Sequence, residues 1–312
     1  MGFTEKELLD HCQTIVKSSR VRNKIVVLCE GGRLEEFNTR RSPSAYRQLS
    51  KVPDANFYKA CIPVSWKNKR PEFFNSGSRA DVLKTYFKLI ELRGSKENGF
   101  LNPNLLFALV DVDIQNADLH NYHLPDIHAV YSSLYSDSGQ SDTIEQKHKI
   151  WTTGLIHKEA YFLLPELQSV FDQFPNPITL NNKKLVLEDL YKQIASESSN
   201  DRDLEVHFEN IKKRLGSLKL NNNSVSTWKD DWLKQFSSSR SEEEKVKLVY
   251  ALFSIRKAKE YWAQISTEEK RLTTEQLRDQ LTLQIGSYFS KSKPAPYNHI
   301  ANFFAFLKRF AK

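Results

Sequence analysis

The chain has 312 residues, enough for one large domain or two ordinary ones, and its 12 Tyr, 19 Phe and 5 Trp supply a sizeable core. A hydrophobic fraction of 39% excludes a disordered protein, and no apolar run approaches the length of a membrane span. The formal net charge of +8 excludes an acidic protein and favours polyanionic partners.

The hydrophobic pattern predicts helices that alternate with strands in the first part of the chain. In chain order, the predicted elements are a helix at 4–18, strands at 24–30 and 56–66, a helix at 78–93, a strand at 105–111, a helix at 125–135, an extended piece at 150–153 and a helix at 158–173. Such alternation indicates right-handed βαβ units, and therefore an α/β fold with a mostly parallel sheet and flanking helices.

The pattern changes after Pro175 and Pro177, beyond which the periodicity is helical with polar breaks. Ser241 and Thr273 each begin a capping-box sequence, and an aromatic helix is predicted at 298–311. We therefore predict an α/β domain at 1–177, followed by an all-helical, basic C-terminal domain at 178–312.

The positive charge is concentrated in the second part of the chain. Residues 181–312 carry 24 Lys and Arg against 17 Asp and Glu, whereas residues 1–180 carry 22 against 21. This asymmetry favours nucleic acid, either DNA or RNA, as the partner, and an ordinary solvated basic surface is the alternative.

The cysteines and the first residues bear on location. Cys12, Cys29 and Cys61 are widely spaced and form no Cys-x-x-Cys pair, so we expect a reducing cytoplasmic environment and no cysteine-based zinc site. The first residues lack the apolar stretch of a secretory signal, and we expect no membrane partner.

Two apolar runs end directly in acidic residues. The run that begins at Lys24 leads into Glu30, and the run that begins at Leu105 leads into Asp111 and Asp113. Open α/β sheets bind ligands at the carboxyl ends of such buried strands. Converging carboxylates repel one another unless a divalent cation neutralises them, so the pattern favours a metal-dependent reaction on phosphate esters. The alternative is that these residues cap neighbouring helices.

These motifs resemble a known family. Glu30-Gly-Gly-Arg-Leu-Glu35 resembles the opening of Toprim domains, in which an apolar strand is followed by Glu-Gly and a helix. The acidic residue five positions after Glu30 is similar to the variant in Toprim-type nucleases of bacterial defence systems, the RloB-like and overcoming-lysogenization-defect groups. Asp111-Val-Asp113 is similar to their Asp-x-Asp strand end.

A later segment extends the resemblance to roughly residues 20–170. Trp151-Thr-Thr-Gly-Leu-Ile-His-Lys158-Glu159 looks like the element in which an acidic residue opens a helix beside the site. The resemblance implies that Glu30, Asp111 and Asp113 bind Mg²⁺ or Mn²⁺, with Glu35 and Glu159 as candidate helpers at a second metal position. It also implies that Lys158 adds positive charge near the scissile phosphate.

Simpler explanations stay open for three of these residues. Glu35 and Glu159 are equally explained as carboxylates in the first turn of a helix, where the helix dipole favours them. For Lys158 the explanation as a solvated surface residue is the favoured one. No tyrosine stands in a context that indicates a nucleophile, so hydrolysis is favoured over strand passage.

A rival metal site is possible in a histidine-rich segment. Its members are Asp118, His120, His123, Asp126 and His128, with His148 and His157 further along the chain. Imidazole and carboxylate groups can bind zinc, manganese or iron, but this loop-like stretch lacks the helical spacing of a known metalloenzyme signature. A loop that lines the acidic site, with one histidine assisting proton transfer, fits equally well.

These observations predict a metal-dependent nuclease, plausibly in defence against mobile genetic elements. The sequence contains no phosphate-binding loop of the ATPase type, so any ATPase or sensor partner would be a separate chain, and a homo-oligomer is possible. One alternative is a non-catalytic nucleic-acid- or protein-binding module with a degenerate Toprim domain, whose helical half presents Trp228, Trp232 and Trp262. Another is a phosphotransferase or primase-like activity on the same acidic site.

Overall fold

The computed structural model describes residues 2–32, 53–94, 99–135, 148–215, 218–268 and 272–311. The chain divides into two compact units. Unit 1 comprises Met1–Val110, Asp142–Thr152 and Leu283–Lys312, and unit 2 comprises Asp111–Ser141 and Thr153–Thr282. Both units combine segments that are distant in sequence. The predicted domain boundary at residue 177 rests on a change in the sequence pattern. Compact units need not follow such a change, so this boundary stays a prediction.

Unit 1 contains the predicted parallel sheet. Its four strands are β1 (Val26–Cys29), β2 (Glu72–Asn75), β3 (Leu106–Val110) and β4 (Ile150–Thr152), in the order β2-β1-β3-β4. All neighbouring strands are parallel, and Cys29 pairs with Asn75 on one side and Leu109 on the other. Every residue of β1 and β3 is buried, which explains why both sequences are continuously apolar.

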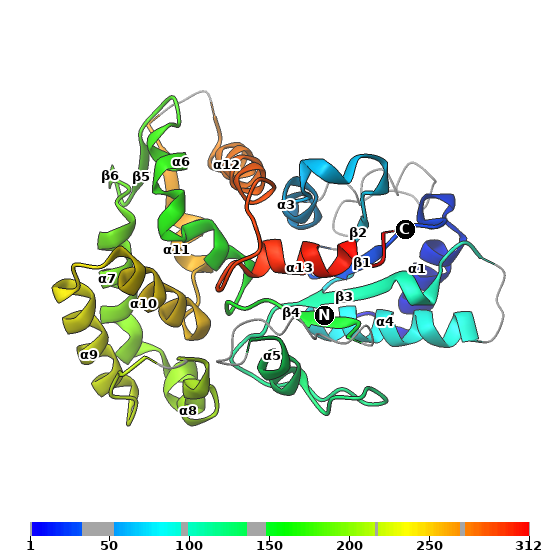
Figure 1. Ribbon diagram of the computed structural model, residues 1–312, viewed down its shortest axis with the longest axis horizontal. Helices are drawn as coiled ribbons and strands as arrows, with labels where there is room; N and C mark the ends of the chain where they lie inside the picture. The colour runs from blue at the N-terminus through cyan, green and yellow to red at the C-terminus, as the bar shows by residue number, and fades with distance from the viewer. Residues whose placement is uncertain are drawn as a thin grey trace. The chain divides into compact units, whose positions relative to one another are not determined.

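Helices cover both faces of this sheet (Figure 1). On one face lies α4 (Arg79–Gly94), which contacts β1 and β3 and supports α1 (Glu5–Lys17). The other face is covered by α3 (Pro53–Ala60) and α13 (His299–Lys308), whose aromatic side chains pack on Phe73 of β2. A helix from the end of the sequence thus completes a layer of the α/β fold that the first part of the sequence begins.

Two predicted elements are wrong. Residues 56–66 are not a strand, because Phe57 and Cys61 are buried at helical spacing in and just after α3, and the Cys61 amide donates to the Phe57 carbonyl. Residues 158–173 are not one helix, because Pro165 cannot continue a helical hydrogen-bond ladder. The segment forms 3-10 helices at Lys158–Leu163 and Pro165–Leu167 and then α6 (Gln168–Asp172).

Unit 2 is largely helical, as predicted for the C-terminal region. Its helices are α5 (Ile127–Tyr135), α6, α7 (Leu187–Ser196), α8 (Arg202–Ile211), α9 (Val225–Ser238), α10 (Glu242–Ile255) and α11 (Lys259–Gln264), and α12 (Thr274–Phe289) begins in it. Trp228, Trp232 and Trp262 are buried, so they belong to the core. No helix in the described ranges is long and apolar enough to cross a membrane.

A small antiparallel sheet interrupts this helical region. It contains β5 (Ile178–Leu180), β6 (Lys183–Lys184) and β7 (Ile265–Thr267), in the order β6-β5-β7. Asn181 and Asn182 join β5 to β6 with φ angles of 51° and 61°. Two successive positive φ angles are typical of a type I′ hairpin turn, which asparagine tolerates better than most residues.

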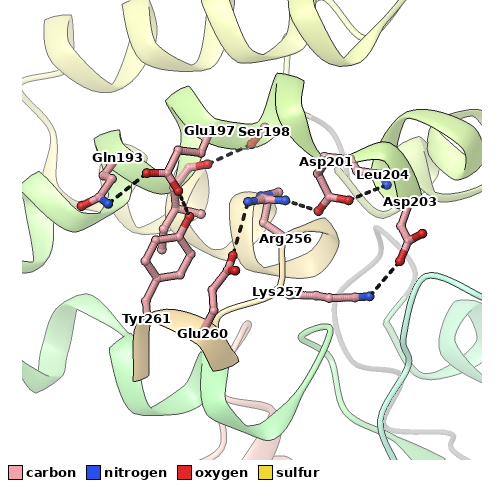
Figure 2. Close-up of polar contacts among 11 residues, drawn as sticks. Gln193, Glu197, Ser198, Asp201, Asp203, Leu204, Arg256, Lys257, Glu260 and Tyr261 are labelled. Atoms are coloured by element: carbon pink, nitrogen blue, oxygen red, sulfur yellow. Dashed lines mark hydrogen bonds and ion pairs between the residues drawn. The ribbon is translucent and has the colours of Figure 1, made fainter. Parts of the chain in front are cut away.

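A buried polar network, the Arg256 cluster, joins the α7–α8 connection to the end of α10 (Figure 2). The Arg256 side chain is only 4% exposed and pairs with Asp201, which also caps α8. Beside it, the Tyr261 hydroxyl donates to Glu197, which also accepts a 2.9 Å hydrogen bond from Gln193. Asp201 and Glu197 therefore each have a direct donor, whereas the exposed Glu260 lies 3.9 Å from the Arg256 guanidinium.

Candidate functional site

The order of the strands defines a switch point in the sheet of unit 1. From β1 the chain passes to β2 on one side, and it then crosses to β3 on the other side of β1. In open α/β sheets, ligands bind outside the carboxyl ends of the strands at such a point. Glu30 directly follows β1, and Asp111 directly follows β3. The two predicted acidic residues therefore continue the two strands that flank the switch point.

A glycine pair fixes the backbone just after Glu30. Gly31 and Gly77 form an antiparallel bridge in which each amide donates to the other's carbonyl, at 3.0 and 3.1 Å. Gly77 has a φ of 84°, a conformation that residues with a Cβ atom rarely adopt. The chain therefore turns sharply at the ends of β1 and β2, and Glu30 is partly exposed beside this turn.

Unit 2 gathers polar residues around Asp111, and we call this group the Asp111 cluster: Asp111, Asp113, His157, Lys158 and Glu159. The His157 Nδ1 atom lies 3.9 Å from the Asp111 Oδ2 atom, and the Lys158 Nζ atom lies 3.8 Å from the Glu159 Oε1 atom. Four of the side chains are 11–19% exposed, and Asp113 is partly exposed. The cluster is therefore poorly hydrated but reachable by solvent.

Burial raises the pKa of Asp111 from 3.8 to about 6. His157 and Lys158 lower this pKa by their positive charge, whereas Glu159 and Asp113 raise it by repulsion. Burial is the largest of these effects, so the ionised carboxylate is penalised in the folded chain. A carboxylate in this condition is stabilised by any cation that approaches it.

Hydrogen bonds within and around the 153–156 loop hold the cluster in place. The Thr153 hydroxyl accepts from the Val112 amide at 3.1 Å and donates to the Leu155 carbonyl at 2.6 Å. The buried Tyr161 hydroxyl accepts from the Gly154 amide at 2.8 Å and from the Leu155 amide at 3.3 Å. These bonds connect the end of β3 to the loop that carries His157 and Lys158.

The Ile156 carbonyl organises two members of the cluster. It accepts from the Asp113 amide at 3.2 Å and lies 2.6 Å from the His157 Nδ1 atom. Asp113 has a φ of 46°, and its Oδ1 atom accepts from the Ile114 amide at 2.6 Å. The second carboxylate oxygen of Asp113 takes no part in that bond. If Nδ1 of His157 donates to the carbonyl, its Nε2 atom is left as the acceptor.

The predicted site residues have different outcomes. Asp111, Asp113, Lys158 and Glu159 come together in unit 2, and Glu159 lies in the first turn of a 3-10 helix, as expected for a carboxylate that opens a helix. Glu30 ends β1 in unit 1. Glu35 lies outside the described residues.

One member, His157, belongs by sequence to the histidine-rich segment, and a histidine beside the acidic site is one of the two expectations for that segment. His157 also directly precedes Lys158 and Glu159 in the resembling motif. That adjacency was the available signal, because any loop that carries Glu159 to the site must carry His157 near it.

The residues of the histidine-rich segment contact different neighbours and do not converge on one metal site. His128 is buried on α5, and its Nε2 atom lies 2.7 Å from the Arg214 guanidinium. Asp118 and Asp126 form a backbone bridge, and the His123 ring contacts Tyr122. Among the described residues, no three His, Cys, Asp or Glu side chains lie close enough to hold a metal ion between them.

Comparison with models of known protein families, with curated proteins and with solved structures finds no match for this chain.

Proposed function

We propose that the chain is a metal-dependent nuclease that hydrolyses phosphodiesters of nucleic acid, with Asp111 and Asp113 as ligands of Mg²⁺ or Mn²⁺. Glu30 is the third ligand that the sequence resemblance implies. The observation that carries this proposal is the switch point between β1 and β3, because an acidic residue directly follows each of these two strands. The basic character of residues 181–312 supports a polyanionic substrate.

The available donors suit a hard divalent cation. All three proposed ligands are carboxylates, and burial makes the negative charge of Asp111 costly when no cation is present. Mg²⁺ usually binds through one or two carboxylates together with waters and phosphate oxygens of the substrate. A closed set of three protein ligands is therefore not required before the substrate binds.

The surrounding residues have separate roles in this proposal. A bound divalent cation supplies a water of lowered pKa and stabilises negative charge on the phosphate. Lys158 adds positive charge beside the phosphodiester, and Glu159 lies 3.8 Å from its ammonium group and holds it near the cluster. The Nδ1 atom of His157 lies 3.9 Å from the Asp111 Oδ2 atom, so the imidazole ring borders the proposed metal ligand and is the candidate for proton transfer there.

A cleavage assay tests the proposal directly. Purified protein is incubated with supercoiled plasmid, linear DNA and structured RNA in Mg²⁺, Mn²⁺ or EDTA. We expect cleavage that requires metal and that is lost in Asp111→Asn and in Glu30→Gln. Asp118→Asn is the matched control, because Asp118 is an exposed aspartate near Asp111 in sequence.

Other outcomes would replace the proposal. Metal-independent binding of nucleic acid or protein without cleavage would indicate a non-catalytic binding module. A product that forms only with added nucleotide would indicate a phosphotransferase or primase-like reaction. We place the activity in the reducing cytoplasm, because Cys12, Cys29 and Cys61 are buried free thiols.

A further inference from the structure

The last part of the chain contains basic residues but no acidic ones. Residues 280–312 contain five Lys and Arg and no Asp or Glu, whereas the whole chain has 38 acidic residues in 312. All described positions from 283 onward belong to unit 1. The side chains of this segment therefore contribute only positive charge, which attracts polyanions.

Part of this segment is an exposed loop between α12 and α13, which we call the 291–297 loop. Lys291 and Lys293 are exposed, and in the described ranges neither forms an ion pair with a carboxylate. Tyr297 ends the loop with its side chain 41% exposed and with a φ of 66°. A large exposed aromatic residue therefore follows two lysines, on a backbone conformation that such residues rarely adopt.

Two asparagine side chains, Asn298 and the buried Asn302, hold the backbone of this loop in one conformation. Asn302 is 3% exposed and binds both backbone groups of Ala295, accepting from its amide at 3.2 Å and donating to its carbonyl at 2.9 Å. The Asn298 side chain donates to the Lys293 carbonyl at 3.0 Å. Because the loop is already ordered, less conformational entropy is lost when it binds a partner.

The contacts of α13 place this loop at the carboxyl edge of the sheet in unit 1. Phe303 contacts Trp151, which pairs with Leu109 near the end of β3. Phe310 contacts Phe107, two residues earlier in β3. The helix therefore runs antiparallel to the strands, as Figure 1 shows, and the loop that precedes it lies at the edge where β1 and β3 end.

We propose that the 291–297 loop binds single-stranded nucleic acid, with Tyr297 stacked on an unpaired base and Lys291 and Lys293 beside the adjoining phosphates. Every base has a face on which an aromatic ring can stack, whereas in a duplex those faces are covered by neighbouring base pairs. This inference rests on the proposed function for nucleic acid as the substrate and deepens it by naming single strands as the preferred form.

The test is fluorescence anisotropy with labelled 20-nucleotide single strands of DNA and RNA and the matching duplexes, in EDTA, on the full chain. Tyr297→Gly removes the ring and suits the positive φ, so the fold is not strained by the change. We expect single strands to bind more tightly than duplexes, Tyr297→Gly to lose about tenfold or more in affinity, and Tyr297→Phe to bind like wild type.

The lysines are tested through the salt dependence of the same binding. Replacing both Lys291 and Lys293 by Gln is expected to reduce the slope of log affinity against log salt by about 1.4. The matched control replaces Lys6 and Lys183, two exposed lysines outside the loop, and is expected to leave more of the slope intact.

Three results would overturn the inference: unchanged affinity in Tyr297→Gly, equal or tighter binding of duplexes, or capture of anionic phospholipid vesicles in preference to the oligonucleotides. Binding in EDTA is independent of cleavage, and Asp111→Asn is measured alongside. Single-strand binding by a wild-type chain that does not cleave would therefore count against the nuclease, and unchanged binding by Tyr297→Gly in a chain that cleaves would count against the loop.

Discussion

The Asp111 cluster and the Arg256 cluster are both largely buried polar groups of unit 2, but their charges are arranged differently. In the Arg256 cluster, Asp201 and Glu197 each accept a direct hydrogen bond from a charged or hydroxyl donor. In the Asp111 cluster, the two ion pairs are 3.9 and 3.8 Å long, and burial outweighs the cations in setting the Asp111 pKa.

The charges of the Arg256 cluster therefore stabilise the folded chain, whereas the ionised carboxylate of Asp111 destabilises it. A buried ion pair with short hydrogen bonds is hard to break, because loss of one partner leaves the other charge buried alone. A carboxylate with a raised pKa makes the folded chain less stable wherever it is ionised. Functional sites are where such unfavourable arrangements are retained.

The largest expected effect comes from breaking the Arg256 cluster. Asp201→Ala leaves the Arg256 guanidinium without its direct carboxylate and removes the cap of α8. We expect a loss of about 3–5 kcal/mol in the free energy of unfolding, measured by urea denaturation. A lower midpoint with an unchanged slope would show that stability alone changed.

A neighbouring pair supplies the control for this experiment. Lys257 and Asp203 form an ion pair of 3.2 Å, but their side chains are 37% and 60% exposed. Lys257→Ala is therefore expected to cost less than about 1 kcal/mol. Similar losses in both variants would mean that burial does not distinguish the Arg256 cluster.

The next effect has the opposite sign. Asp111→Asn removes a charge that the folded chain disfavours, so the variant is expected to be more stable than wild type by about 3 kcal/mol at pH 8 in EDTA. Below pH 3.8 Asp111 is protonated in both the folded and the unfolded chain, and the two proteins should match. As the pH rises from 3.8 through about 6, only the wild type loses stability, because its unfolded state releases the proton first.

Thermal unfolding across this pH range measures the difference, with Asp118→Asn as the exposed control. A variant that is less stable than wild type at pH 8 would show that Asp111 supports the fold, and the comparison between the two clusters would fail. A stability difference that does not change with pH would show that ionisation of Asp111 is not its cause.

The sequence predicted the central strands and most helices correctly, because their information is local. The continuous apolar runs before Glu30 and Asp111 located β1 and β3. The four-residue strand β2 was missed, since so short a segment carries no periodicity. The Asn181-Asn182 turn is typical of a hairpin, but the strands beside it have only three and two residues and give no alternating pattern.

Tertiary contacts could not be predicted in the same way. The aromatic residues at 303–310 predicted a helix, but nothing in their spacing indicated that it would cover the N-terminal sheet. The contact between His128 and Arg214 could not be predicted either, because the two residues are 86 positions apart in the sequence. Within the site, the motifs located Asp111 and Glu159, whereas the burial that sets the Asp111 pKa depends on the packed structure.

A smaller effect tests the hydroxyl of the Arg256 cluster. Tyr261→Phe removes the donor to Glu197, which keeps its 2.9 Å bond from Gln193. We expect a loss of about 1 kcal/mol, measured by urea denaturation. Tyr250→Phe is the comparison variant, because the Tyr250 hydroxyl donates to Glu166 over a longer distance of 3.2 Å. Equal stability of Tyr261→Phe and wild type would show that the Tyr261–Glu197 hydrogen bond is no stronger than the hydrogen bonds that these groups form with water in the unfolded chain.

The smallest expected effect is a change in the pKa of Asp111 when its neighbours are altered. After burial, His157 lowers this pKa and Glu159 raises it. His157→Gln should therefore raise the pKa above about 6, and Glu159→Gln should lower it, each by a fraction of a unit. Carboxyl ¹³C resonances of labelled aspartates, assigned with Asp111→Asn and titrated in EDTA, give both values. Shifts of opposite sign would establish that Asp111 is balanced between its neighbours, whereas shifts of the same sign would mean that changes in burial override their charges.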